Sequence, residues 1–174
     1  MKKAKGVKNS GERNKADNPF WGVLRISMGW IFLWPFFDKL FGLGFATSPD
    51  KAGIAGSSPT YGFLALATKG PFADFFRSLA GSPLVDWLFM LGLLFIGLAL
   101  IFGVGINIAS ISGIIMLMLM WLAVLPPQYN PVVDEHIIYS LILVMFIKIK
   151  EVESFSIANT KWVRIIVEKH PYLR

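Results

Sequence analysis

The clearest indication of the fold is PLVDWLFMLGLLFIGLALIFGVGINIASISGIIMLMLMWLAVLPP, residues 83–127. It contains two apolar runs, residues 84–102 and 106–125, and Asp86 is its one charged residue. A helix that crosses about 30 Å of hydrocarbon needs about 20 residues, and each run approaches that length. Two consecutive prolines, Pro126 and Pro127, halt the second run. The stretch therefore predicts two successive transmembrane helices.

Two further apolar segments flank this pair. The first, residues 19–43, opens with Pro19 at the first helical position. The last, residues 131–149, is less regular, because only its second part is an uninterrupted apolar stretch, Lys148 aside. The core of a soluble domain would not contain four such apolar segments in succession. We predict an all-α membrane protein whose four-transmembrane-helix bundle occupies residues 19–149.

The composition supports lipid as the solvent and excludes several kinds of cofactor. Hydrophobic residues make up 55% of the 174-residue chain and charged residues 16%, with a mean hydropathy of +0.58. The absence of cysteine excludes disulfides, thiolate metal sites and iron–sulfur ligation. The two histidines, His136 and His170, are predicted on opposite sides of the membrane, which argues against haem within one monomer. No flavin motif is found and no metal site is predicted, although a carboxylate site shared with another subunit stays open.

The basic residues indicate the topology. Six of the 17 precede the first apolar segment, six lie from Lys148 onward at the end of the last segment and after it, three lie in the first long loop and none in the next outer loop. Because Lys and Arg favour the cytoplasmic side, we predict cytoplasmic tails at residues 1–18 and 150–174 of a multi-pass protein in the cell membrane. The net charge of +6 does not form a single patch, so nucleic acid is not an expected partner.

The first outer loop, residues 44–83, is too long for a plain connector. Its start, residues 46–60, is rich in Gly, Ser and Pro and is expected to be irregular. Residues 71–79 are expected to form a short helix that lies along the membrane interface, or alternatively packs over the bundle. Its apolar face would hold Phe72, Phe75, Phe76 and Leu79.

Arg25 lies about seven residues into the first span, where an unpaired charge costs at least a few kcal/mol. It is expected either to extend toward the inner surface or to face the bundle interior and pair with a polar neighbour such as Asn107. Gly22 and Gly29 lie on or beside the same helical stripe. We interpret them as packing notches rather than cofactor contacts.

A second group of polar residues is predicted to meet at the outer side of the bundle: Asp38, Lys39, Asp86, Glu135 and His136. Lys39 is expected to pair with one of the carboxylates. Such a mixed site could bind an oxyanion or a quinone head group, while Glu135 and His136 transfer protons.

A structural role is the alternative for this outer group. Asp134 is expected to cap the fourth helix, where negative charge favours the N-terminal dipole. For Glu135 and His136 the sequence leaves capping and proton transfer open. The tryptophans are interpreted as interface anchors rather than as stacking partners for a quinone.

Three motifs carry a family resemblance: RISMGWIFLW (25–34) before Asp38-Lys39, VDWLFMLG (85–92) before Gly97 and Gly103, and NPVVDEHIIY (130–139). Together they resemble the DoxX/DoxD family of small membrane proteins, over residues 20–147. The resemblance implies four membrane helices. One branch of the family is the large subunit of thiosulfate:quinone oxidoreductase, which passes electrons from thiosulfate to a membrane quinone.

From the resemblance we expect a DoxX/DoxD-like membrane subunit of a quinone-linked oxidoreductase, with thiosulfate or another small sulfur compound as electron donor. Its expected partners are membrane lipid, quinone as electron acceptor, and a second subunit or further copies of the chain. The expected catalytic residues are Glu135 and His136; the expected substrate-binding residues are Arg25, Asp38, Lys39, Asp86 and Asn107. The alternative functions are a non-catalytic anchor or assembly subunit for soluble redox partners and, third, a small transporter.

Overall fold

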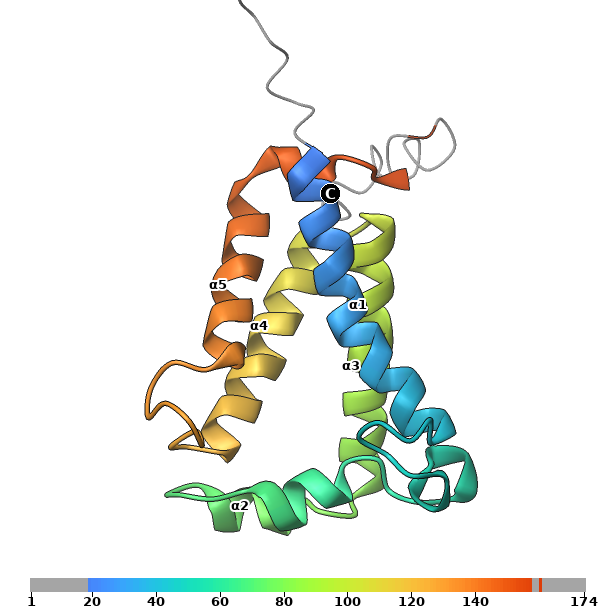
Figure 1. Ribbon diagram of the computed structural model, residues 1–174, viewed down its shortest axis with the longest axis vertical. Helices are drawn as coiled ribbons and strands as arrows, with labels where there is room; N and C mark the ends of the chain where they lie inside the picture. The colour runs from blue at the N-terminus through green and yellow to red at the C-terminus, as the bar shows by residue number, and fades with distance from the viewer. Residues whose placement is uncertain (1–18, 158–159, 161–174) are drawn as a thin grey trace, which may run out of the picture.

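The structure is a computed structural model that describes residues 19–157 and residue 160. Four helices run up and down as neighbours in one bundle (Figure 1): α1 (Pro19–Phe41), α3 (Pro83–Phe102), α4 (Ile106–Ala123) and α5 (Glu135–Lys148). The described residues contain no β-strand. The tails predicted at residues 1–18 and 150–174 lie outside the described part of the chain, except for residues 150–157 and 160.

Three of these helices, α1, α3 and α4, are long and apolar enough to cross a membrane. Their bounds agree closely with the first three predicted spans, which indicates a membrane protein. The fourth helix, α5, has 14 residues and begins at Glu135 rather than at residue 131. The later start has a local cause, because Asp134 provides the cap that begins the helix.

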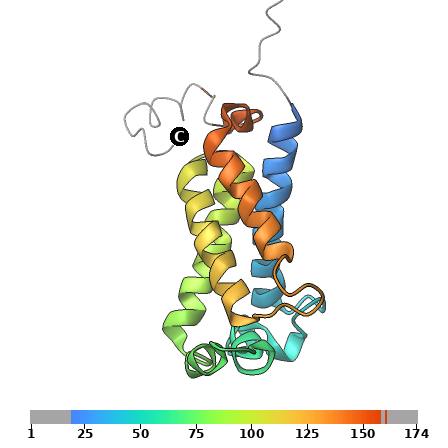
Figure 2. The same cartoon turned by 90° about the vertical axis from the view of Figure 1, so that its left-hand side faces the viewer.

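The bundle has two different ends (Figure 2). At the tail end, α1 begins, a short turn joins α3 to α4, and residues 150–157 cross the start of α1. We call residues 150–157 the strap; it includes the short helix η4 (Lys150–Glu153). At the loop end lie the long loop between α1 and α3 and the connection between α4 and α5.

The long loop contains several short elements: η1 (Pro49–Lys51), η2 (Gly53–Ala55), the π-helix η3 (Gly62–Ala67) and α2 (Ala73–Ser78). Helix α2 lies across the bundle axis (Figure 1). Phe76 of α2 is buried in a small cluster with Leu64 and Ala123. Phe72 and Phe75 remain exposed, so the predicted apolar face is divided between the bundle and the outside.

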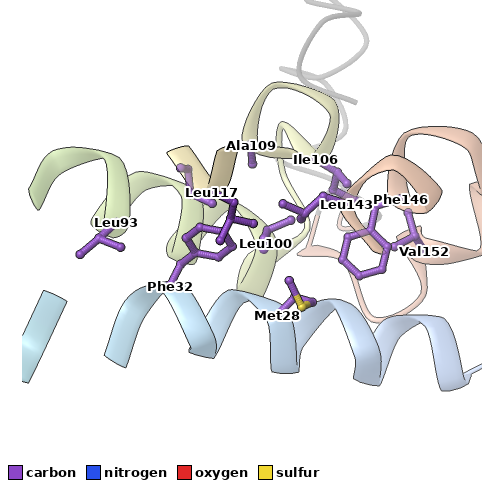
Figure 3. Close-up of a cluster of buried hydrophobic side chains, with 11 residues drawn as sticks. Met28, Phe32, Leu93, Leu100, Ile106, Ala109, Leu117, Leu143, Phe146 and Val152 are labelled. Carbon is purple, nitrogen blue, oxygen red and sulfur yellow. The ribbon is translucent and has the colours of Figure 1, made fainter. Parts of the chain in front are cut away.

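One hydrophobic core joins all four long helices and the strap. Figure 3 shows Met28 and Phe32 of α1 directed toward the residues of the other elements. The buried members are Met28, Phe32, Leu93, Ile96, Leu100, Ile106, Ala109, Leu117, Leu143, Phe146 and Val152. The outward sides of the helices are also apolar, as Leu88, Phe95 and Leu141 show with exposed fractions of 63%, 63% and 57%. Apolar residues inside and outside are what a bundle in lipid requires.

Helices α1 and α3 cross at two glycines. A Cβ atom on Gly29 would lie 2.9 Å from the Gly97 carbonyl oxygen, and one on Gly97 would lie 2.9 Å from the Leu33 nitrogen. The two backbones are therefore in contact, which only residues without a side chain allow. The interpretation of Gly29 as a packing notch is confirmed.

Candidate functional site

Arg25 is completely buried at the tail end. Its Nε donates to the Val152 carbonyl at 2.9 Å, and its Nη2 donates to the Ser154 carbonyl at 3.0 Å. Its Nη1 donates to the carbonyls of Leu100 and of Ile101, the second at 3.1 Å. The guanidinium thus binds the last turn of α3 and the strap together.

The expected partner of Arg25 was Asn107, and this part of the prediction is wrong. Asn107 is exposed, while Arg25 neither contacts it by a hydrogen bond nor extends to the surface. The reason lies in the end of α3, whose last carbonyl groups have no partner within the helix and carry the negative end of its dipole. These carbonyls and those of the strap satisfy a buried cation without a carboxylate.

Two glycines, Gly22 and Gly103, leave the space that the strap occupies. A Cβ atom on Gly22 would lie 2.6 Å from both the Phe155 ring and the Ser154 carbonyl oxygen. Gly103 has a φ of +73°, and a Cβ atom there would lie 2.7 Å from Arg25 Nη1. The Ser156 hydroxyl donates to the Gly103 carbonyl at 2.6 Å. The strap therefore fits closely against α1 and against the end of α3.

Asp38 is a buried carboxylate of the loop end, with an exposed fraction of 1%. It accepts hydrogen bonds from the backbone nitrogens of Phe45, at 3.2 Å, and Ala46, at 3.0 Å. These bonds fix the turn that follows α1. Lys39, beside it in sequence, is only partly buried and forms no salt bridge among the described residues, so the predicted ion pair of Lys39 is absent there.

Asp86, in the first turn of α3, binds a different part of the loop. Its Oδ1 accepts from the Ser58 hydroxyl at 2.9 Å, from the Thr60 hydroxyl at 2.6 Å and from the Thr60 backbone nitrogen at 3.1 Å. Asp38 and Asp86 both lie at the loop end, as predicted. Their hydrogen bonds, however, hold the loop to the bundle rather than form one shared site.

The start of α5 is the least buried of the three polar regions. Asp134 accepts from the backbone nitrogens of His136, at 3.1 Å, and Ile137, at 3.3 Å, which confirms its predicted role as a cap. Its other oxygen lies 2.8 Å from His136 Nδ1, and the two side chains are 10% and 12% exposed respectively. Glu135 is exposed in the same turn. A histidine held by a carboxylate next to a second, accessible carboxylate can exchange protons with water.

The same three residues are the group in the described chain that most resembles a metal site. One ligand atom from each of Asp134, Glu135 and His136 lies within 4.8 Å of the others. Both oxygens of Asp134 are already engaged, one by the helix cap and one by the imidazole. A metal ion would have to replace these bonds, so the arrangement suits proton transfer better than metal binding.

Two cavities lie away from the predicted residues. An apolar groove of about 470 Å³ runs between α3 and α4 toward the tail end, with Phe95, Phe102, Ile108 and Ile157 in its wall. A shallow depression of about 420 Å³ follows Trp30, Ile31, Trp34 and Pro35 on α1. Neither is lined by Glu135 or His136.

The sequence did not reveal the partners of these charges. Ser58 and Thr60, which donate to Asp86, lie in the segment that is predicted only to be irregular. Their two hydroxyl groups, two positions apart, are the one feature of the sequence that could have indicated a bound carboxylate. The acceptors of Arg25 are backbone carbonyls. Every residue has a carbonyl group, so the amino-acid type does not show which of them accepts a bond from Arg25. Ser110 was also missed: it is buried in α4, and its hydroxyl lacks a hydrogen-bond partner among the described residues.

Comparison with known proteins adds no relative, because no family model, curated protein or solved structure matches the chain. The DoxX/DoxD resemblance accordingly stands on its three motifs. Their polar residues are divided between the two ends of the bundle, with Arg25 at the tail end and Asp38, Asp86 and His136 at the loop end.

Proposed function

We propose that this protein is a DoxX/DoxD-like membrane subunit of a quinone-linked oxidoreductase. The observation that supports the proposal best is the pair formed by Asp134 and His136, joined at 2.8 Å beside the exposed Glu135. In this proposal the tail end is cytoplasmic and the loop end faces outward, as the distribution of Lys and Arg favours.

The proposal includes α5 as a fourth span. Its 14 residues correspond to about 21 Å of helix, and α5 packs along α4 while exposing Ile138, Leu141 and Val144. The chain from residue 131 to the cap adds length at the loop end. Helix α2, which lies across the bundle axis with Phe72 and Phe75 exposed, is the interfacial helix.

The reduction of a quinone consumes two electrons and two protons. An imidazole whose Nδ1–H is held by Asp134 presents Nε2 for proton exchange, and Glu135 connects this turn to water. The electrons come from thiosulfate or another small sulfur compound through a partner subunit. Lys39 and Arg77 supply positive charge at the loop end that would attract such an oxyanion.

Two substitutions test this proposal in the purified protein with its partner. His136→Ala and Glu135→Gln should each lower quinone reduction about 100-fold or more, the range expected for a general acid or base. Asp50→Asn, which neutralises another exposed carboxylate of the loop end, is the matched control and should leave turnover unchanged. Thermal stability is measured on the same samples. Unchanged turnover in both variants would remove this site from the mechanism.

A membrane anchor or assembly subunit is the second candidate, and a specific observation favours it. Arg25, Asp38 and Asp86, three of the residues expected to bind substrate, are engaged in hydrogen bonds that hold the fold. Purification in mild detergent with mass spectrometry of bound quinone and protein separates the two functions. A stoichiometric soluble partner without quinone would support the anchor, and bound quinone would support the oxidoreductase.

A further inference from the structure

Helix α1 carries unpaired polar groups on its outward side. Pro35 lies inside the helix and has no N–H, so the Ile31 carbonyl lacks the donor that a regular helix provides four residues later. No side chain in the described part of the chain donates to this carbonyl. The indole N–H groups of Trp30 and Trp34 also have no hydrogen-bond partner among the described residues. Two donors and one acceptor are therefore available on this side of α1.

The same four residues line the shallow depression on α1, which has a volume of about 420 Å³. Trp30 and Ile31 are 50% and 38% exposed. The rings of Trp30 and Trp34 lie 5.8 Å apart, centroid to centroid, with an angle of 37° between their planes. The Phe45 ring meets Trp34 edge-on at 4.9 Å. The unpaired polar groups and the aromatic rings therefore belong to one small surface.

The depression lies at the middle of the membrane span. Trp30 is the central residue of α1, about 16 Å of helix from either end. Phe32, between the two tryptophans, packs on α4 near its middle, since a Cβ atom on Gly113 would lie 3.2 Å from the Phe32 ring. Tryptophans that anchor a helix lie at the membrane interface, so Trp30 is too deep for that role. Water and lipid head groups, which pair with polar groups at the ends of a span, do not reach this depth.

We infer that this depression binds the head group of a membrane quinol, the reduced form of the quinone in the proposed function. The inference rests on that function and adds to it a binding site for the product on the outward side of α1. A quinol hydroxyl donates to the Ile31 carbonyl, and the ring oxygens accept from the indole N–H groups. The quinol ring lies against the indole faces, while its apolar tail stays in the lipid beside α1.

The hydrogen-bonding groups of the depression favour a quinol over the other molecules of a membrane. Phospholipid acyl chains reach the middle of the bilayer, but they have no polar group to pair with a carbonyl or an indole. The ring of an oxidised quinone carries only acceptors, so it leaves the Ile31 carbonyl unpaired, which is costly in lipid. A quinol combines a donor, two acceptors and a planar ring in one molecule. We therefore expect the quinol to bind about tenfold more tightly than the quinone, the effect of one hydrogen bond away from water.

Fluorine NMR of the full chain labelled with 5-fluorotryptophan measures binding at each indole separately. The protein in mild detergent is titrated with decylubiquinol and, in a second series, with decylubiquinone. Replacing each tryptophan in turn by phenylalanine assigns the signals. The signals of Trp30 and Trp34 should shift and reach saturation, at about tenfold lower concentration of the quinol than of the quinone. The signal of Trp87, another exposed tryptophan of a membrane helix, should not move.

Substitutions in α1 assign the binding to the unpaired groups. Pro35→Ala returns an N–H to the helix, which pairs with the Ile31 carbonyl, and it removes a residue that weakens a helix. This variant should bind the quinol about tenfold more weakly and lose the preference over the quinone, while its thermal stability stays equal or rises. Trp30→Phe keeps a ring but removes the N–H, and should weaken binding about fivefold. Trp87→Phe is the matched control and should leave the affinity unchanged.

The outcomes separate this site from the proposed function. Unchanged quinol affinity in Pro35→Ala would overturn the inference. A shift of the Trp121 signal without one at Trp30 and Trp34 would also overturn it, but would leave the proposed function intact, because the Trp121 indole binds the Val132 carbonyl beside the start of α5. A Trp30 signal that moves with protein concentration in the absence of quinol would assign the depression to a second copy of the chain instead. If no tryptophan signal responds to either form, both the inference and the proposed function are contradicted.

Discussion

The two ends of the bundle use buried or partly buried charges of opposite sign for the same purpose. At the tail end Arg25 donates to carbonyls of α3 and the strap, whereas at the loop end Asp38 and Asp86 accept from amides and hydroxyls of the long loop. The end of a helix leaves carbonyls without partners, and an irregular loop leaves backbone N–H groups without partners. The sign of each buried charge thus follows the backbone group that it must satisfy.

The largest effect is expected at the tail end. Arg25→Leu leaves four carbonyls without their donor in a buried region and should lower the free energy of unfolding by about 3–5 kcal/mol. Lys51→Leu, at an exposed lysine of the long loop, is the control and should change it by less than about 0.5 kcal/mol. Unfolding in detergent measures both. Equal stability of Arg25→Leu and the unmodified chain would contradict the account of the tail end.

The loop end should be the next most sensitive. Asp86→Ala removes the acceptor of three hydrogen bonds and should cost about 2–3 kcal/mol, because bonds to a charged acceptor are the stronger kind. Limited proteolysis should then cut the loop near Ser58 faster. Asp50→Ala is the control, at an exposed carboxyl whose pKa is lowered mainly by a hydrogen bond from Ser48, and it should leave the cutting rate unchanged. Equal cutting rates in the two variants would show that Asp86 does not hold the loop.

Two glycines, one at each end of the bundle, differ in how closely other atoms approach them. Gly22→Ala places a methyl group against the strap at the tail end, and overpacking of this kind costs about 1–3 kcal/mol. Gly62→Ala adds the same methyl group at the loop end, where nothing lies within 4 Å of it, and should not destabilise the protein. Chemical denaturation in detergent compares the two, and a similar loss in both variants would mean that the strap is not closely seated.

The smallest effect is expected at the start of α5, where the charge is not fully buried. Asp134→Ala should lower the free energy of unfolding by about 1 kcal/mol, the usual value of a helix cap. Asp134→Asn retains an oxygen that can accept from the backbone of His136 and should restore most of it. A loss as large as that of Arg25→Leu would contradict this account, because it would show that Asp134 contributes as much to stability as the buried Arg25.

The membrane helices could be predicted because their signals are local. Pro19, Pro83 and the two prolines after residue 125 mark helix ends by steric rules, and the apolar runs between them have the length of a span. The cap at Asp134 was predictable for the same reason, since the capping side chain and the backbone groups that it binds are neighbours in sequence. The π-helix η3 had no comparable signal.

The contacts of the buried charges could not be predicted, because their partners are distant and mostly belong to the backbone. Arg25 and Val152 are 127 positions apart, and a carbonyl group is present at every residue. Asn107 has a polar side chain, but the carbonyls at the end of α3 already serve as acceptors for Arg25. Side-chain chemistry indicated correctly that Arg25 needed a partner, and only the path of the strap determined which one.

The distance between Arg25 and the strap also matters during synthesis. Arg25 is made early, but two of its acceptors, the carbonyls of Val152 and Ser154, are made more than 120 residues later. Until then the first helix carries a guanidinium without its full set of partners, which is costly in lipid. A chain that ends before residue 152 therefore keeps this deficit and should be less stable in the membrane than the full chain.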